Sequence, residues 1–306
     1  MSFSSKIKNE AAVEIPKARH CRIAELAAIY SGLKPQGRVR ISKKIIIFKT
    51  ENLTVANKSY ILLRKVFHTA PEVMVRHHRG AKGSNVYMIA LSGEDIVESF
   101  TKTMKLKPDY DISCGKLIQS ECCKRAFLRG AFLVSGSMID PNKSYHLEIV
   151  SQNSGYTEAL KRIMGAFDFD VRITTRKKAE VLYIKEGTQI SDFLNYIQAY
   201  KCMLDFENVR IVKGVRNNIN RGVNCETANI SRIVSAAQKQ REDILLIKQK
   251  MGLQNLSPGL RQIAELRLNY PEASLQELAD LLGPNISKSG VNHRLRRLSE
   301  IAKNYK

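Results

Sequence analysis

The sequence contains no long uninterrupted run of apolar residues. No stretch approaches the roughly 20 consecutive apolar residues that a membrane-spanning helix needs. The first residues, MSFSSKIKNEAAVE, also lack the apolar segment and the cleavage site of a secretory signal. We therefore expect a cytoplasmic protein that has no membrane partner.

Cysteine is scarce and lacks the spacing of a metal-binding motif. Cys122 and Cys123 are adjacent, and the other four are scattered: Cys21, Cys114, Cys202 and Cys225. No CxxC pair occurs, which argues against a zinc ribbon and against a thioredoxin-like redox site. We expect reduced and mostly buried thiols, with no metal and no cofactor.

Acidic residues are few relative to basic ones. The 306 residues include 50 Lys and Arg but only 29 Asp and Glu, a formal net charge of +21. Residues 201–306 hold 18 basic and 10 acidic residues, a net charge of +8, which leaves +13 for residues 1–200. An excess of this size favours a polyanionic partner. Double-stranded DNA is therefore the expected partner, and a basic surface that is merely solvated is the alternative.

The hydrophobic content and the length indicate a folded chain of several domains. Hydrophobic residues make up 43% of the sequence, which is enough for packed cores. A chain of this length is typical of two or three domains.

An internal repeat occurs with an offset of 104 residues. The stretch AELAAIYSG at 24–32 matches LRGAFLVSG at 128–136 in length, apolar character and terminal Ser-Gly. The offset pairs Ala27 with Ala131, Ser31 with Ser135, and Gly32 with Gly136. Small residues at positions i and i+4 share one helical face. We therefore expect two helices whose backbones approach closely.

The segments that follow the two repeated helices predict the same order of elements. In the first half, β-rich runs cover 38–41, 44–49, 72–77 and 85–91, and helical stretches cover 53–68 and 93–104. In the second half, strands are predicted at 145–150, 170–175 and 179–185, and helices at 155–167 and 190–200. With the repeat as a guide, we interpret each half as αββαββα in an α+β fold, although only three strands of the second half are predicted individually. The predicted domains are an N-terminal segment (1–19), half one (20–104), a linker (105–121) and half two (122–200).

Residues 201–256 form a third region, interpreted as a basic linker and a helix. The sequence favours a helix from about Thr227 onward. Residues 210–224 are basic and rich in Asn, which is typical either of a loop on a nucleic acid or of a simple linker. Arg210, Lys213, Arg216 and Arg221 are possible DNA contacts in this stretch.

The last fifty residues, 257–306, carry the signals of a helix-turn-helix. A first helix is expected from Pro258, a favourable first-turn residue, to just before Pro271. Ser274 and Glu277 have the spacing of a capping box, which predicts the start of a second helix. Gly283 ends that helix, and a third helix follows to about residue 304. The helix-turn-helix is therefore predicted at about 274–304.

A helical wheel of the third helix separates an apolar face from a polar face. Val291, Leu295, Leu298 and Ile301 share the apolar face. Arg and Asn side chains read base edges in the major groove, whereas Ser and Lys suit phosphate contacts. The candidate DNA-binding residues are Ser287, Lys288, Ser289, Asn292, His293, Arg294, Arg296, Arg297 and Lys303. Arg294 lies near the apolar edge and is expected only at the DNA backbone. The alternative is a solvated basic face on a small helical bundle.

Two resemblances extend these patterns. The repeated helices resemble the LAGLIDADG helices of homing endonucleases, which implies a pseudo-two-fold α+β fold. Along nearly the whole chain, the segments KNE (8–10), CCKRAFLRGAFLVSGS, SYHLEIV, NVRIVKGVRNNINRGVNCETANI and SKSGVNHRLRRL resemble the WhiA family. The terminal module is similar to the helix-turn-helix of sigma-factor region 4. The resemblance implies a nucleoid-associated transcriptional regulator of sporulation, cell division or chromosome segregation.

The repeated helices depart from the endonuclease pattern at one position. LAGLIDADG endonucleases place an acidic metal ligand before the final glycine of each helix, whereas this sequence has Ser31 and Ser135 there. A Mg²⁺ site needs anionic oxygen ligands. We therefore expect no catalytic residues and no enzymatic activity. The alternatives are a cryptic metal-dependent endonuclease and a protein-binding scaffold, for example for a sigma factor or another transcription factor.

Overall fold

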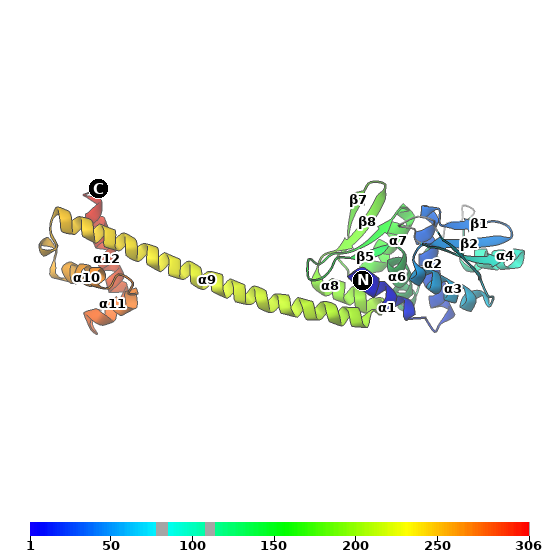
Figure 1. Ribbon diagram of the computed structural model, residues 1–306, viewed down its shortest axis with the longest axis horizontal. Coiled ribbons are helices and arrows are strands. Elements are labelled where there is room, and N and C mark those ends of the chain that lie inside the picture. Colours follow the sequence, from blue (N-terminus) through cyan, green and yellow to red (C-terminus); the bar gives the residue numbers. More distant parts are fainter. Residues whose placement is uncertain (78–84, 108–113, 306) are drawn as a thin grey trace. The chain divides into compact units, whose positions relative to one another are not determined.

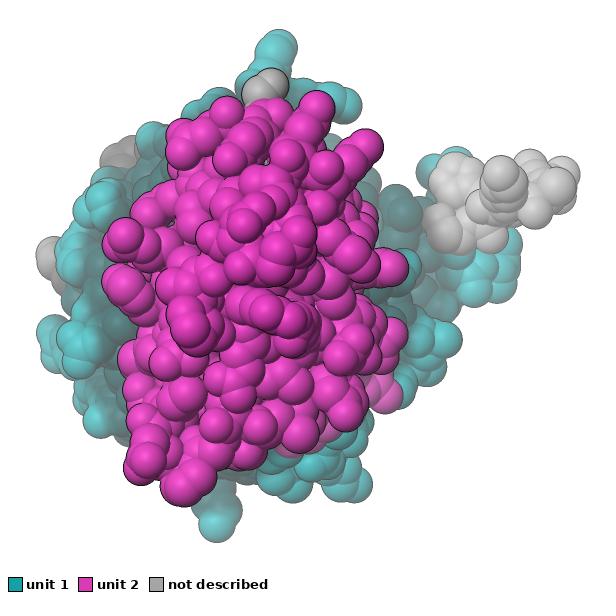
Figure 2. Space-filling view, turned by 90° about the vertical axis from the view of Figure 1, so that its left-hand side faces the viewer, with its two compact units in different colours: residues 1–213 teal, residues 214–306 magenta. Residues whose placement is uncertain are grey.

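A computed structural model describes residues 1–306 except 78–84, 108–113 and 306 (Figure 1). The chain forms two compact units, Met1–Lys213 and Gly214–Lys306, which Figure 2 shows in different colours. Part of the predicted linker at 105–121 lies outside the described residues. Among those described, no helix has both the length and the apolar composition to cross a bilayer.

The N-terminal unit contains two successive halves with the same order of elements. The first half comprises α2 (Arg19–Leu33), β1 (Val39–Ile41), β2 (Ile45–Thr50), α3 (Leu53–Phe67), β3 (Glu72–Arg76), β4 (Val86–Ser92) and α4 (Glu94–Thr103). The second half comprises α6 (Glu121–Ser135), β5 (Gly136–Met138), β6 (Leu147–Ser151), α7 (Ser154–Gly165), β7 (Arg172–Arg176), β8 (Ala179–Ile184) and α8 (Gly187–Tyr196). The predicted αββαββα repeat is therefore confirmed.

Each half folds its strands into one antiparallel sheet of the same topology. The orders are β1-β2-β4-β3 and β5-β6-β8-β7. Strand β2 alternates buried and half-buried side chains, with Ile46 and Phe48 on the core side, as expected when one sheet face covers a core. Asn52 and Asn153 cap α3 and α7 at the same place in each half, because each side chain accepts a hydrogen bond from the following backbone.

The two repeated helices, α2 and α6, lie side by side between the sheets (Figure 1). Ala24, Ala27, Ala28 and Ala131 are fully buried at this contact, which confirms the predicted close packing. A side chain at Gly130 would place its Cβ 2.5 Å from the carbonyl oxygen of Glu25, so only glycine permits this approach.

The N-terminal segment belongs to the same unit. Helix α1 (Phe3–Val13) buries Ile7 and Ala11 in the core. The hydroxyl of Ser4 donates to the carbonyl of Met138 at 2.8 Å and accepts from its N–H at 2.6 Å. Residues 1–19 therefore contribute to the unit that contains both halves. A short helix, α5 (Cys114–Leu117), precedes α6.

The basic stretch 210–224 is helical, and its interpretation as a loop is wrong. It lies inside α9 (Tyr200–Lys250), a continuous helix of 51 residues. The many Asn and Gly residues favoured a loop, but no proline occurs between Pro141 and Pro258 to interrupt the backbone hydrogen bonds. Apolar residues also recur every four positions, at Val215, Ile219 and Val223, which is a helical period.

The C-terminal unit is all-helical. After residues 214–250 of α9 come α10 (Pro258–Asn269), α11 (Leu275–Leu282) and α12 (Lys288–Lys303). Its core joins Ile244 and Ile247 of α9 to Ile263, Leu278 and Leu295 of the three shorter helices. The predicted helix-turn-helix region is confirmed.

Candidate nucleic-acid interface

Helix α12 has one buried face and one exposed face. Val291, Leu295, Leu298 and Ala302 are buried, and Ile301 is partly buried against the same core. The candidate residues that the structure leaves exposed are Ser287, Lys288, Ser289, His293, Arg296, Arg297 and Lys303. Asn292 is half-buried on the same helix. The exposed face therefore brings together five basic or imidazole side chains, and the exposed acidic residue Glu300 lies one turn from Arg296.

The two helices of the turn begin at well-defined caps. The N–H of Glu277 donates to Ser274 Oγ at 3.2 Å, and the N–H of Ser274 donates to Glu277 Oε2 at 2.6 Å. The latter bond holds the pKa of the Glu277 carboxyl below its ordinary value. Gly283 ends α11 with a φ of +102°, which favours glycine. Ser287 caps α12 by accepting from the N–H of Gly290 at 3.2 Å. These contacts set where α11 begins and ends and where α12 begins.

A buried arginine, which the sequence reasoning missed, holds the connection between α10 and α11. Arg267 is only 2% exposed, and its Nη1 donates to the carbonyl of Ala273 at 2.6 Å. Burial lowers the pKa of this guanidinium. A basic residue in the last turn of a helix, seven positions before a capping serine, was the sequence signal for this contact.

A groove of about 300 Å³ runs beside the start of α12. Lys288 and Asn292 of α12 line it together with Gln276 of α11. Arg232 of α9 also lines the groove and is exposed. The sequence reasoning missed Arg232, because it lies 56 residues before Lys288 and only the packing of α9 brings the two together. Arg232 and Lys288 therefore bring two cationic side chains to the lining of one groove.

Three other side chains that were predicted to contact DNA form hydrogen bonds within the protein. Arg294 Nη1 lies 3.5 Å from the carbonyl of Gly259, so this side chain is directed toward the start of α10. Arg210 donates to Thr188 Oγ1 at 3.0 Å and pairs with Glu207, and Lys213 donates to the carbonyl of Pro141 at 2.7 Å. Arg216 and Arg221, in contrast, are exposed on α9.

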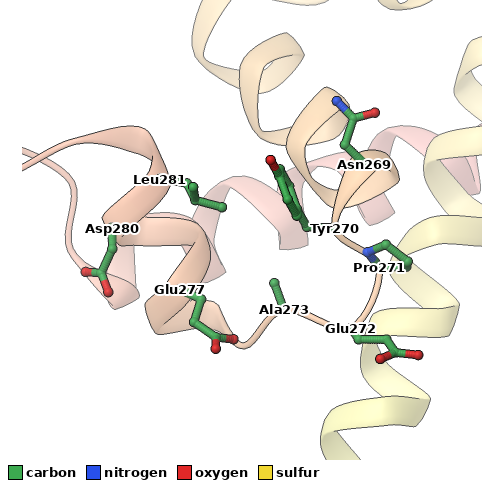
Figure 3. Close-up of a pocket in the computed structure, with 8 residues that line it drawn as sticks. All are labelled: Asn269, Tyr270, Pro271, Glu272, Ala273, Glu277, Asp280 and Leu281. Carbon is green, nitrogen blue, oxygen red and sulfur yellow. The ribbon is translucent and has the colours of Figure 1, made fainter.

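A second hollow in the C-terminal unit has the opposite charge. Tyr270 and Leu281 point toward one another across it, and Glu272, Glu277 and Asp280 bring three carboxylates to its lining (Figure 3). Carboxylates repel phosphate, so this hollow is unsuited to DNA. The cationic candidates lie on α9 and α12, and the hollow lies between the end of α10 and α11.

Comparison with known proteins agrees with this architecture. Three family models match in succession: the WhiA N-terminal LAGLIDADG-like domain at residues 19–107, the WhiA LAGLIDADG-like domain at 124–216, and the WhiA C-terminal HTH domain at 219–302. The chain belongs to the WhiA family.

Relatives within the WhiA family align over the full length. A probable cell division protein WhiA of Lachnoclostridium phytofermentans is 44% identical over 99% of this chain and 98% of its own length. One of Clostridium botulinum is 41% identical with the same coverage. The crystal structure of full-length DUF199/WhiA from Thermatoga maritima superposes with a TM-score of 0.60 at 27% identity, covering 100% of this chain and 99% of that chain.

The LAGLIDADG-like helices of this WhiA protein end without carboxylates. Ser31 and Ser135 are half-buried near the C-terminal ends of α2 and α6, and Ser135 Oγ donates to the carbonyl of Ala131 at 3.4 Å. In the described part of the chain, the only group of three or more His, Cys, Asp or Glu side chains close enough to share a metal ion lies elsewhere. That group is at the N-terminal ends of the same helices.

A charged cluster is buried in the middle of the WhiA helix pair. Glu25 accepts from Arg129 and from Lys58 Nζ, the latter at 2.9 Å, and all three side chains are at most 2% exposed. Arg129 also donates to Gln198, and Lys58 donates to the carbonyl of Glu14. Burial lowers the pKa of Lys58, and the negative charge of Glu25 opposes this shift. Because all three charged groups form hydrogen bonds within the protein, we interpret the cluster as a structural one that holds the helices together.

The cysteines are free thiols wherever they are described. Cys21, Cys123 and Cys202 are buried, whereas Cys122 and Cys225 are exposed. The side chain of Cys114 lies outside the described residues. Three of these five are buried, in agreement with the expectation of mostly buried thiols, and Cys122 and Cys225 are the two exposed ones.

Proposed function

We propose that this WhiA protein is a DNA-binding transcriptional regulator that acts in cell division, chromosome segregation or sporulation and does not cleave DNA. The exposed basic face of α12, set opposite a buried apolar face in a helix-turn-helix, carries the proposal. The names of the relatives, probable cell division protein, support the cellular process. Sequence-selective binding would place the protein on the nucleoid.

Selection from a random pool of duplexes tests this function. The purified full chain should enrich a defined sequence, and a variant with Arg296→Ala and Arg297→Ala should fail to enrich it. A variant with Glu272→Gln, on the acidic hollow, is the matched control and should enrich the same sequence as the wild type. Enrichment of no sequence by the folded wild-type protein would remove the proposal.

The absence of nuclease activity rests on Ser31 and Ser135. A neutral hydroxyl cannot replace the carboxylates that hold Mg²⁺ and help to activate water. Supercoiled plasmid and the enriched duplex should therefore stay intact with excess protein and either Mg²⁺ or Mn²⁺. Ser31→Asp with Ser135→Asp should at most create metal affinity, because two facing carboxylates repel each other without a metal. Metal-dependent cleavage by the wild type that a single substitution in the N-terminal unit abolishes would establish the endonuclease alternative.

A protein-binding role is a second candidate, favoured by one surface of α9. Val215, Ile219, Val223, Ile230 and Val234 are each more than half exposed and lie on one side of the helix. Such a stripe suits another transcription factor, such as a sigma factor. Replacing Val215 and Ile219 by Ser should leave the DNA affinity of the purified protein unchanged and reduce transcription from bound promoters in cells. Unchanged transcription would count against this role.

A further inference from the structure

Four side chains with metal-binding atoms meet at the N-terminal ends of α2 and α6. His20 and Cys21 are the second and third residues of α2, and Cys122 and Cys123 are the second and third residues of α6. Their ligand atoms all lie within 4.8 Å of one another. His20 Nδ1 is 3.1 Å from Cys123 Sγ and 3.4 Å from Cys21 Sγ.

The spacing of these atoms fits a tetrahedral zinc ion. Bond lengths of about 2.3 Å to sulfur and about 2.0 Å to nitrogen place tetrahedral ligand atoms roughly 3.5–3.8 Å apart. The distances from His20 Nδ1 to the two sulfur atoms, 3.1 and 3.4 Å, are slightly shorter than this range. No two of the ligand atoms are farther apart than 4.8 Å, which is about one ångström above the range. Small side-chain rotations therefore suffice to close the site around a metal.

We propose that His20, Cys21, Cys122 and Cys123 bind one zinc ion as a Cys₃His site. Three thiolates and one imidazole select a soft or borderline metal over Mg²⁺ or Ca²⁺. All four positions are taken by protein ligands, as in structural zinc sites and unlike catalytic ones. The ion therefore serves structure.

The surroundings of the cluster suit its charge. Three thiolates and one Zn²⁺ carry a net charge of −1, and the positive ends of two helices, α2 and α6, both terminate at the cluster. His20 and Cys122 are exposed, whereas Cys21 and Cys123 are buried. The exposed pair gives a metal ion a path from solvent, and the buried pair shields it once bound.

Zinc would join the two halves of the repeat at one end. Each half supplies two adjacent ligands, so the ion crosslinks α2 to α6 as the Glu25–Arg129 pair does at their middle. The sequence signal is an adjacent pair of ligands near the start of each repeated helix, His-Cys in one and Cys-Cys in the other, two positions out of the repeat register. A search for CxxC spacing could not detect it.

Cobalt substitution in the full chain tests this site. The protein is stripped with a chelator, kept reduced without oxygen, and titrated with Co²⁺ alone. One equivalent should produce thiolate-to-cobalt charge-transfer absorption and the intense visible bands of a tetrahedral site. One equivalent of Zn²⁺ should then remove these bands. Absence of the bands in the folded, reduced wild type would overturn the proposal.

Exposed ligands provide variants that should still fold. Cys122→Ser and His20→Asn should each weaken Co²⁺ binding at least about 10-fold, and Cys122→Ser should reduce the charge-transfer absorption by roughly a third, because it removes one thiolate of three. Cys225→Ser, an exposed cysteine on α9, is the matched control and should behave as the wild type. Loss of binding in both ligand variants with circular dichroism unchanged would support the site. A Co²⁺ spectrum unaffected by Cys122→Ser would refute it.

Discussion

Glu25 and Arg129 occupy equivalent positions in the two halves, 104 residues apart, and form a buried bidentate ion pair across the helix contact. Arg129 Nε donates to Glu25 Oε1 at 2.8 Å, and Nη2 donates to Oε2 at 3.0 Å. A repeat with identical residues would place two like charges here. The two halves therefore carry opposite charges at this equivalent position, and the attraction between these charges joins them.

Removing the carboxylate should strongly destabilise the N-terminal unit. Glu25→Gln removes the buried counter-charge of Arg129 and Lys58, and breaking a buried pair in this way costs about 3–5 kcal/mol. Asp170→Asn, at an exposed ion pair with Arg172, is the control and should change stability by less than about 1 kcal/mol. Hydrogen exchange of the α2 and α6 amides in the full chain measures the change in unfolding free energy for each of the two variants. A loss below about 1 kcal/mol for Glu25→Gln would show that water or another group compensates the two cations.

Gly130→Ala should also weaken the contact between α2 and α6. The added Cβ would lie 2.5 Å from the Glu25 carbonyl oxygen and 3.0 Å from Ala28 Cβ, so the helix backbones must separate. Overpacking of this kind costs about 1–3 kcal/mol. Gly165→Ala, in α7 with no atom within 4 Å of the new Cβ, is the matched control and should stabilise by about 0.4–1 kcal/mol. Thermal unfolding of the two variants should therefore shift in opposite directions.

Arg296 and Lys288 should affect DNA binding differently. If Arg296 reads a base, Arg296→Ala costs about 1–3 kcal/mol on the enriched duplex and much less on a random one. Lys288, beside the groove at the start of α12, is expected at a phosphate, so Lys288→Ala should weaken both duplexes alike. Fluorescence anisotropy at one fixed salt concentration gives the ratio of variant to wild-type affinity on each duplex. Equal losses on both duplexes for Arg296→Ala would exclude it from base recognition.

The N-terminal unit should add affinity that depends on salt but not on DNA sequence. Residues 1–200 carry +13 of the +21 net charge, and Arg172 and Arg176 are exposed on strand β7. Replacing both by Ala in the full chain should weaken binding to random duplex. The slope of log affinity against log salt should become shallower by about 0.9 for each phosphate that the variant no longer neutralises. Lys102→Ala, at an exposed side chain of α4, is the control and should leave the slope unchanged. An unchanged slope in the double variant would show that Arg172 and Arg176 neutralise no phosphates and would count against a contribution of the N-terminal unit to DNA binding.

The capping box of α11 should make the C-terminal unit sensitive to acid. The pKa of Glu277 is lowered in the folded protein, so its stabilising effect is present above the ordinary carboxyl pKa of about 4.5 and is lost as the pH falls through the folded value. Glu277→Gln cannot ionise. Hydrogen exchange of the α11 amides should therefore be slower in the wild type than in Glu277→Gln at pH 6, and this difference should shrink below pH 4.5. A difference that stays constant with pH would assign the effect to hydrogen bonding alone.

The sequence by itself determined the elements whose causes are local. Apolar periodicity and β-rich runs predicted the strands and helices of both halves except the three-residue strand β5, and Ser274 with Glu277 predicted the start of α11. These signals act over a few residues, because caps, turns and helical faces depend on near neighbours along the chain. In 210–224, two local signals conflicted: Asn and Gly favoured a loop, whereas the apolar period favoured a helix, and the backbone of α9 followed the period.

Only the tertiary structure decided which distant residues meet. Glu25, Lys58 and Arg129 converge because α2, α3 and α6 pack together, and His20 meets Cys123 because α2 and α6 run side by side from their first turns. Arg232 reaches the groove beside Lys288 by the packing of α9 against the helix-turn-helix. Each of these contacts joins residues more than 30 positions apart. Their pairing depends on the relative placement of whole helices, which the burial of apolar faces sets and which no short sequence pattern contains.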